Sequence, residues 1–280
     1  MTVPDDYLLD AQQYLKIQRV ADKALQQAEA YGVFPTPVKS IMDAAKIEEV
    51  EDDVLDESFL AKFRKKGKKA LRRALGKVIG FSDFLSRFII VDRSIHIAKQ
   101  VFVRLHETGH NLMQWHRRAY RMVELDNSSI KPDVANIFDR EAQVFASIVL
   151  FQNGRFSNDA REMDFGLQTA VDLSDKYGAS IYSSVWEFVA KNSRPCIVLV
   201  TSPPKLCFGD GFRARLIHKI PSPTFAQEFG DPLFPRVFTP DDDIGQLLTV
   251  SPCSGSDKKT ICVSTSQGDR YECVAESYSN

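Results

Sequence analysis

Residues 101–115 read VFVRLHETGHNLMQW and contain the pentapeptide HETGH at positions 106–110. Apolar residues and histidines recur here at intervals of three and four, which predicts an amphipathic helix. His106 and His110 are then one turn apart and share a face of that helix. Two imidazoles in this arrangement can bind one zinc ion, and Glu107 can polarise a water molecule on it. The segment therefore predicts a metal site built on a helix.

A chance match to this pattern is improbable in this composition. The chain has 5 histidines among 280 residues, so a random H-E-x-x-H is expected in well under ~1% of such sequences. Gly109 lies on the same predicted face, and we expect it to leave room where a bulkier residue would crowd the metal. The scarcity of histidine and the helical context both favour a functional site.

The overall composition is typical of a soluble globular protein, with 44% hydrophobic and 26% charged residues. A net charge of −1 gives no general attraction to nucleic acid or to an anionic membrane. No apolar run approaches the ~20 residues of a membrane span, and the acidic N-terminus lacks the apolar core of a secretory signal. The five cysteines form no C-x-x-C pair and are odd in number. We expect a cytoplasmic protein with reduced thiols and no membrane partner.

The pattern along the chain predicts an α+β protein with a change of character near residue 194. Residues 1–194 are expected to form a mostly helical domain with a small sheet, and residues 195–280 a smaller β-rich domain of unknown role. The expected helices are 10–31, 38–45, 101–115, 134–151, 165–174 and 179–191. The expected strands are 88–92, with a hairpin continued at 95–97, and then 196–200, 212–220, 260–264 and 271–275. The polar residues 117–131 are expected to be irregular.

Two segments raise the question of DNA binding. Residues 62–73 are strongly basic and follow an acidic run at 48–53, and we favour a solvated face that pairs with that run. Residues 165–191 predict two helices around Gly178, a helix-turn-helix-like pair that more often serves packing than DNA readout. DNA is therefore the weaker of the expected partners.

A catalytic zinc site normally needs a third protein ligand and one position left open for water. Asp139 and Glu141 lie on the next long predicted helix, and because they are two residues apart only one of them can face the metal. Asp139 aligns with Ala142 and Ala146, small residues that would let this helix approach the metal helix closely. Glu141 instead aligns with an apolar, core-like stripe. We favour Asp139 as the ligand, with Glu141 as the alternative.

A peptide-hydrolysing site would also need a hydrogen-bond donor for the developing oxyanion. His116 and Tyr120 follow the motif closely, but His116 falls off the ligand face of the helix when the helical period is continued. We expect both to be ordinary surface residues. The sequence assigns no oxyanion donor.

These motifs together resemble the ImmA/IrrE family of metallopeptidases. Members carry a strand, then a helix with H-E-x-G-H, and after a spacer an E-x-x-A-x-x-F-A helix that supplies the third ligand. The matching segments here are the strand at 88–92, HETGH at 106–110 and DREAQVFA at 139–146. The match places Asp139 where the family usually has Glu. Because Asp is one methylene shorter, the helices must lie closer together or Glu141 must take its place.

The resemblance covers about residues 35–195 and implies a zincin-like fold. It implies that His106, His110 and Asp139 bind zinc, with manganese as an alternative ion, and that Glu107 is the general base. It also implies a bacterial or phage-derived peptidase that cleaves one protein target, a helix-turn-helix repressor, and so induces stress or mobile-element genes. The alternative is a transcriptional regulator or anti-repressor that binds a repressor or DNA without cleaving it, although such a protein has no use for Glu107.

Overall fold

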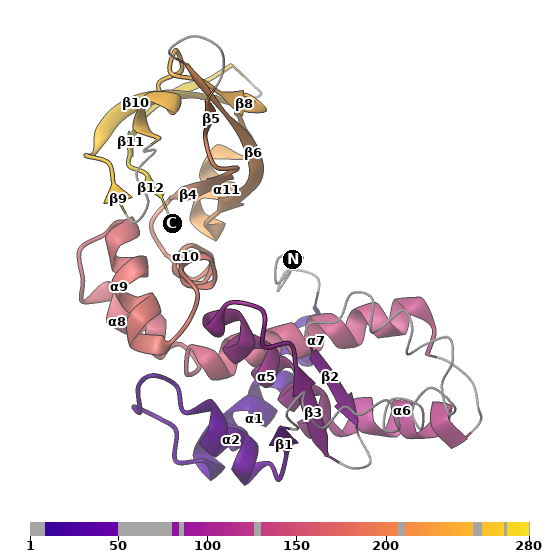
Figure 1. Ribbon diagram of the computed structural model, residues 1–280. Helices are drawn as coiled ribbons and strands as arrows, with labels where there is room; N and C mark the ends of the chain where they lie inside the picture. Colours follow the sequence, from indigo (N-terminus) through magenta and orange to yellow (C-terminus); the bar gives the residue numbers. More distant parts are fainter. Residues whose placement is uncertain are drawn as a thin grey trace. The chain divides into compact units, whose positions relative to one another are not determined.

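The computed structural model describes residues 9–49, 80–83, 87–125, 130–206, 211–248, 254–265 and 268–279. Over these residues the protein is α+β, with long helices and several small sheets (Figure 1). It divides into two compact units: the first unit is Met1–Arg155 with Lys176–Ala179, and the second unit is Phe156–Asp175 with Ser180–Asn280. The basic segment at 62–73 lies outside the described residues.

The first unit is built on helices whose apolar stripes form its core. Its elements are α1 (Ala11–Gln27), α2 (Val38–Ala44), β1 (Glu48–Glu49), β2 (Gly80–Asp83), β3 (Phe88–Val91), α5 (Ile97–Leu112), α6 (Gln114–Leu125) and α7 (Pro132–Leu150). Asp10 caps α1 through a reciprocal pair of hydrogen bonds with Gln13, a capping box. The helix buries Ile17, Ala21 and Leu25 completely, and their spacing of four residues places them on one face.

Three short strands lie beside α5, with β3 in the centre, β1 parallel to it and β2 antiparallel to it. The expected strand at 88–92 is confirmed, and it buries Ile89 and Val91. The expected hairpin continuation at 95–97 is wrong, because β3 pairs with the upstream strand β2 instead. The His96 side chain accepts a hydrogen bond from the Ala98 amide and caps α5, which begins at Ile97.

Helix α5 ends earlier than its pattern predicts, and a second helix follows at once. Met113 has an extended ψ of 103°, and its amide still bonds to the Gly109 carbonyl. Helix α6 then covers most of the segment expected to be irregular, so that expectation is wrong. Trp115, Ala119 and Met122 recur in it at helical spacing, so the sequence did carry a signal for this helix.

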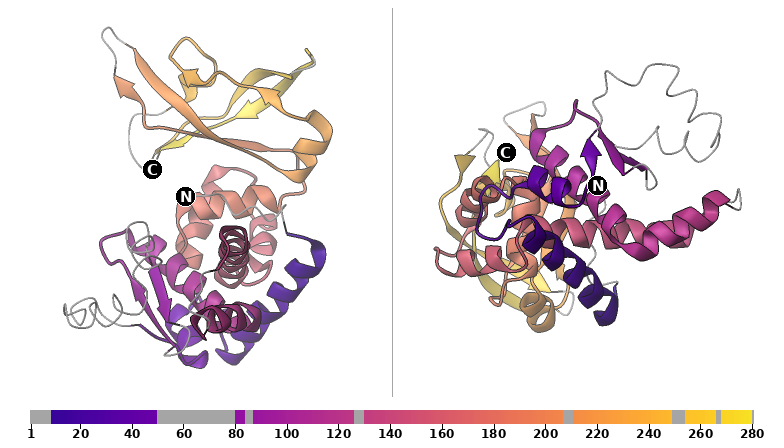
Figure 2. Two further views of the ribbon diagram at one scale, coloured as in Figure 1. Left: turned by 90° about the vertical axis from the view of Figure 1, so that its right-hand side faces the viewer. Right: turned by 90° about the horizontal axis from the view of Figure 1, so that it is seen from below.

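The second unit combines short helices with the strands expected after residue 194 (Figure 2). Its main elements are α8 (Arg155–Arg161), α9 (Leu167–Tyr177), α10 (Ile181–Ala190), β4 (Ile197–Thr201), β5 (Lys205–Leu206), β6 (Phe212–Pro221), α11 (Pro223–Phe229), β7 (Pro232–Leu233), β8 (Val237–Phe238), β9 (Ser254–Gly255), β10 (Lys259–Thr265), β11 (Arg270–Ala275) and β12 (Tyr278–Ser279). β6 pairs with β4, β5 and β8, whereas β10 pairs with β11 and β7.

The second unit begins at Phe156, well before the change of composition near residue 194. The physical reason is that helix α10 packs against β4 and β6 and so belongs with the strands. The two helices expected around Gly178 are present as α9 and α10.

Two further features concern membrane-spanning helices and the cysteines. No helix in the described part of the chain is both long enough and apolar enough to cross a bilayer. Cys196, Cys262 and Cys273, the cysteines within that part, carry free thiols.

Candidate metal centre

His106, His110 and Asp139 come together between helices α5 and α7. The Nε2 atom of His106 lies 3.2 Å from Nε2 of His110 and 3.4 Å from Oδ1 of Asp139. The three residues offer one ligand atom each, and all three atoms lie within 4.8 Å of one another. A tetrahedral zinc ion with bonds of about 2.0–2.1 Å separates its ligand atoms by about 3.3–3.4 Å. These two distances fit this geometry, so the group could hold a metal ion.

Helix α7 reaches the histidines because α5 has a glycine where the two helices touch. A Cβ atom added at Gly109 would lie 2.7 Å from Cδ1 of the Phe145 ring. Gly109 is thus needed for contact between the helices. Ala142 and Ala146 are completely buried on α7, as expected of the small-residue stripe that carries Asp139.

The two candidate carboxylates on α7 have different surroundings. Asp139 is 54% exposed, and its Oδ2 accepts a hydrogen bond of 2.8 Å from Gln143, while Oδ1 faces His106. Glu141 is buried, and its Oε2 lies 2.6 Å from the Trp115 indole nitrogen. The structure therefore places Asp139, and not Glu141, in the group of candidate ligands.

His116 is completely buried, so the expectation that it is a surface residue is wrong. Its Nε2 atom lies 2.5 Å from Oε2 of Glu141, and its Nδ1 atom lies 3.0 Å from Nδ1 of His110. Its ring stacks on Phe138, with centroids 4.0 Å apart. The period of α5 does not continue past the bend at Met113, and a face assigned by counting across that bend is therefore misplaced.

Tyr120 is the second residue wrongly expected to be an ordinary surface residue. It is partly buried, and its ring centroid lies 6.3 Å from that of His110. Burial raises the pKa of Tyr120 to about 12, and the nearby carboxylates Glu107 and Asp139 add to the effect. The phenol therefore keeps its proton near neutral pH. Tyr120 lies four residues after His116, and this spacing places both side chains on one face of α6.

Burial controls the charge states of the motif. It raises the pKa of Glu107, and the neighbouring Asp139 raises it further against the opposing effect of His106. It lowers the pKa of His110 well below its usual value, helped by the adjacent imidazoles of His106 and His116. The neutral imidazole is the form that binds a metal ion.

His106 behaves differently from His110 because carboxylates adjoin it. Burial lowers its pKa, but the hydrogen bond with Asp139 and the charge of Glu107 outweigh burial and leave the pKa above its usual value. A metal ion at this position would compete with that proton, so binding should release it.

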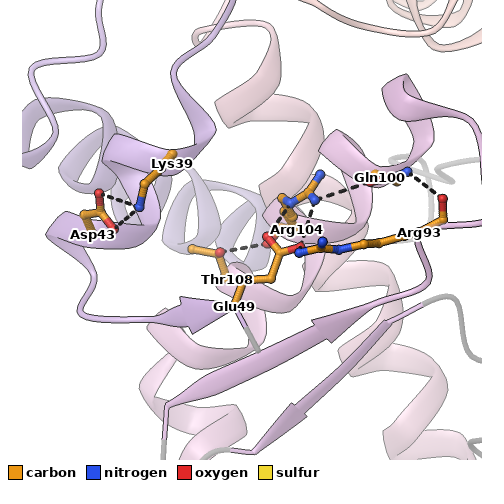
Figure 3. A network of polar contacts seen from close by, with 7 residues as sticks. All are labelled: Lys39, Asp43, Glu49, Arg93, Gln100, Arg104 and Thr108. Carbon is orange, nitrogen blue, oxygen red and sulfur yellow. Dashed lines mark hydrogen bonds and ion pairs between the residues drawn. The ribbon is translucent and has the colours of Figure 1, made fainter. Parts of the chain in front are cut away.

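A partly buried ion pair holds α5 against the sheet on another side of the helix (Figure 3). Arg104 Nε and Nη2 donate to the two carboxylate oxygens of Glu49 over 2.6 and 2.8 Å. The hydrogen bond from Arg104 lowers the pKa of Glu49 despite its partial burial. The Arg104 carbonyl in turn accepts a hydrogen bond from the Thr108 hydroxyl. These contacts connect β1 to the turn of α5 that carries the motif.

Comparison with known proteins gives no family assignment. No protein-family model matches the chain, and no curated protein matches it. The chain is similar to the solved structure of a Mycobacterium tuberculosis transcriptional regulator, with a TM-score of 0.47 and 11% sequence identity. The similarity covers 93% of this chain and 68% of that chain. At this level it carries no argument about function.

Proposed function

We propose that the protein is a zinc-dependent metallopeptidase of the ImmA/IrrE type with a zincin-like catalytic unit. The observation that carries the proposal is the group of His106, His110 and Asp139, whose ligand atoms all lie within 4.8 Å of one another. The separations of His106 Nε2 from the other two ligand atoms, 3.2 and 3.4 Å, suit one tetrahedral ion. The buried carboxylate of Glu107 follows the first of these ligands directly. A purely structural zinc site is normally closed by four protein ligands, whereas three ligands leave a position for water.

The residues of the site have separate roles in the proposed reaction. A bound zinc ion would lower the pKa of a water molecule and polarise the scissile carbonyl. Glu107 accepts a proton from the attacking water and passes it to the leaving amine, and its raised pKa brings it closer to the pH at which both transfers are efficient. Tyr120 keeps its proton beside His110 and is the candidate donor to the oxyanion.

We further propose that the substrate is a protein, specifically a helix-turn-helix repressor whose cleavage induces stress or mobile-element genes. The support is the resemblance of HETGH and DREAQVFA to the motifs of regulatory metallopeptidases. Zinc is the expected ion because two imidazoles and a carboxylate suit it, and manganese is the alternative.

A Glu107→Gln variant tests the catalytic role. It should retain the fold and about one metal ion per chain, but cleave the repressor encoded beside its gene at least ~100-fold more slowly, because only the general base is lost. The control is Glu162→Gln, at an exposed position in the second unit, which should cleave normally. Repressor inactivation at the normal rate by Glu107→Gln would contradict the proposal and favour a regulator that acts by binding alone.

A further inference from the structure

We infer that His116 and Glu141 are positioning residues for the metal centre: together they fix the tautomer and ring orientation of His110. The inference rests on the metal site proposed above and adds a pair of buried residues to it. The three side chains form a continuous chain of contacts from Glu141 through His116 to His110. His116 lies on α6 and Glu141 on α7, whereas His110 lies on α5.

The positions of the protons follow from the geometry. A His110 ring that binds metal through Nε2, the atom facing His106, carries its proton on Nδ1. That N–H then donates across 3.0 Å to Nδ1 of His116, which must be unprotonated to accept it. The proton of neutral His116 is therefore on Nε2, where it donates across 2.5 Å to the Glu141 carboxylate. Each N–H thus faces an acceptor. If either histidine had the other tautomer, two N–H groups or two lone pairs would face each other.

The contacts from Glu141 through His116 to His110 are called the relay below, and the groups around it hold it in this arrangement. His116 is completely buried and stacks on Phe138, so its ring cannot turn without repacking. Glu141 also accepts a hydrogen bond from the Trp115 indole N–H, which is a donor only. The indole in turn lies under the Lys16 ammonium, 3.7 Å from the ring centroid. The Glu141 carboxylate, at the acceptor end of the relay, is thus held by Trp115, which is itself in contact with Lys16.

A metal-binding histidine usually donates its second N–H to a carboxylate or carbonyl, which makes it a better ligand. Here an imidazole lies between the ligand and the carboxylate. The relay should therefore increase metal affinity, and not merely stabilise the fold. Metal affinity distinguishes the two roles, because a structural residue supports the melting temperature without affecting the affinity of the folded protein.

The first experiment compares His116→Phe with His218→Phe in the full chain. Phenylalanine at 116 keeps an aromatic ring on Phe138 but removes the relay, and zinc affinity, measured by competition with a chelator, should fall about 10- to 100-fold. His218→Phe makes the same substitution on β6 in the second unit, away from the ligand group, and should keep zinc affinity within about twofold. Unchanged affinity in His116→Phe, or an equal loss in both variants, would overturn the inference.

A second measurement does not depend on His116→Phe folding. Long-range proton–nitrogen NMR spectra of the zinc-loaded wild type should show His110 protonated on Nδ1 and His116 protonated on Nε2. The conservative variant Glu141→Gln keeps an acceptor oxygen for His116 and should retain these tautomers with a smaller loss of affinity. A zinc-loaded protein with His116 protonated on Nδ1 would overturn the inference.

These outcomes separate the relay from the proposed function. A wild-type protein that binds no zinc would contradict the metal site itself. A wild type that binds zinc tightly, with His116→Phe binding it equally well, would contradict the relay alone. Cobalt(II) absorption spectra give a further readout that does not depend on the peptidase assay. A displaced His110 would change the d–d bands of a four-coordinate cobalt ion.

Discussion

Two regions around helix α5 differ in what holds them in place. The ligand group, His106, His110 and Asp139, brings two imidazoles and a half-exposed carboxylate together. The scaffold contacts, Gly109 with Phe145 and Arg104 with Glu49, are close or bidentate and need no ion to complete them. The difference indicates that the first region is arranged for a ligand and the second for stability. Substitutions should therefore separate metal binding from folding.

The largest effect is expected at His110. His110→Ala removes a ligand and should reduce metal content from about one ion per chain to background, measured by elemental analysis of purified protein. The metal-free fold should persist, because the scaffold contacts are intact. Full occupancy in this variant would remove the basis of the ligand group.

Asp139 tests the ligand group from the second helix. Asp139→Ala should weaken zinc binding by more than about 100-fold, since a direct ligand contributes more than an outer-shell partner, whose loss costs about 10- to 100-fold. Asp133→Ala, at an exposed position in the first turn of α7, is the matched control and should bind zinc normally. Glu141→Ala should retain zinc better than Asp139→Ala. A greater loss of zinc affinity in Glu141→Ala than in Asp139→Ala would show that the third ligand is Glu141, two residues further along α7.

Gly109 tests the scaffold contacts. A methyl group at this position would press against the buried Phe145 ring, and overpacking of this kind typically costs about 1–3 kcal/mol, which outweighs the higher helix propensity of alanine. Chemical denaturation of metal-free Gly109→Ala should show this loss, and adding Phe145→Leu should recover part of it. Gly211→Ala, where a Cβ atom meets nothing within 4 Å, should change stability little. Unaltered stability of Gly109→Ala would show that α5 and α7 do not approach as described.

The smallest effect is expected at the ion pair of Glu49. Its pKa is lowered in the folded protein, so its contribution is present above the pKa of the unfolded chain and is lost as the pH falls through the folded value. Glu49→Gln should cost about 1 kcal/mol near neutral pH, and the difference from wild type should shrink in acid. Zinc affinity should stay within about twofold.

The exposed pair of Lys39 and Asp43 is the control for that variant (Figure 3). Asp43→Asn breaks an i,i+4 pair on the surface of α2 and should cost no more than about 0.5 kcal/mol at any pH. A loss in Glu49→Gln no larger than this would show that the connection between β1 and α5 contributes little to stability.

The sequence by itself determined the local part of the candidate site. The four-residue spacing of His106 and His110 places both on one face of any helix, and the two-residue spacing of Asp139 and Glu141 prevents both from facing the same way. Helical geometry depends only on the neighbouring chain, so these inferences needed no tertiary information. The strand at 88–92 and the longer strands β4, β6, β10 and β11 were likewise predicted from the local pattern, with ends shifted by one or two positions, whereas the two-residue strands of the second unit were not.

Tertiary structure decided what depends on residues far apart in the sequence. The bend at Met113 redirects α6 and buries His116 against Glu141, and no helical period counted through 113 reveals this. The partner strand of β3 lies upstream because pairing is set by the whole sheet. Gly109 is required by close contact with Phe145, 36 positions along the chain. Close packing and burial are properties of the assembled unit, and only the assembled unit determines which polar groups meet inside it.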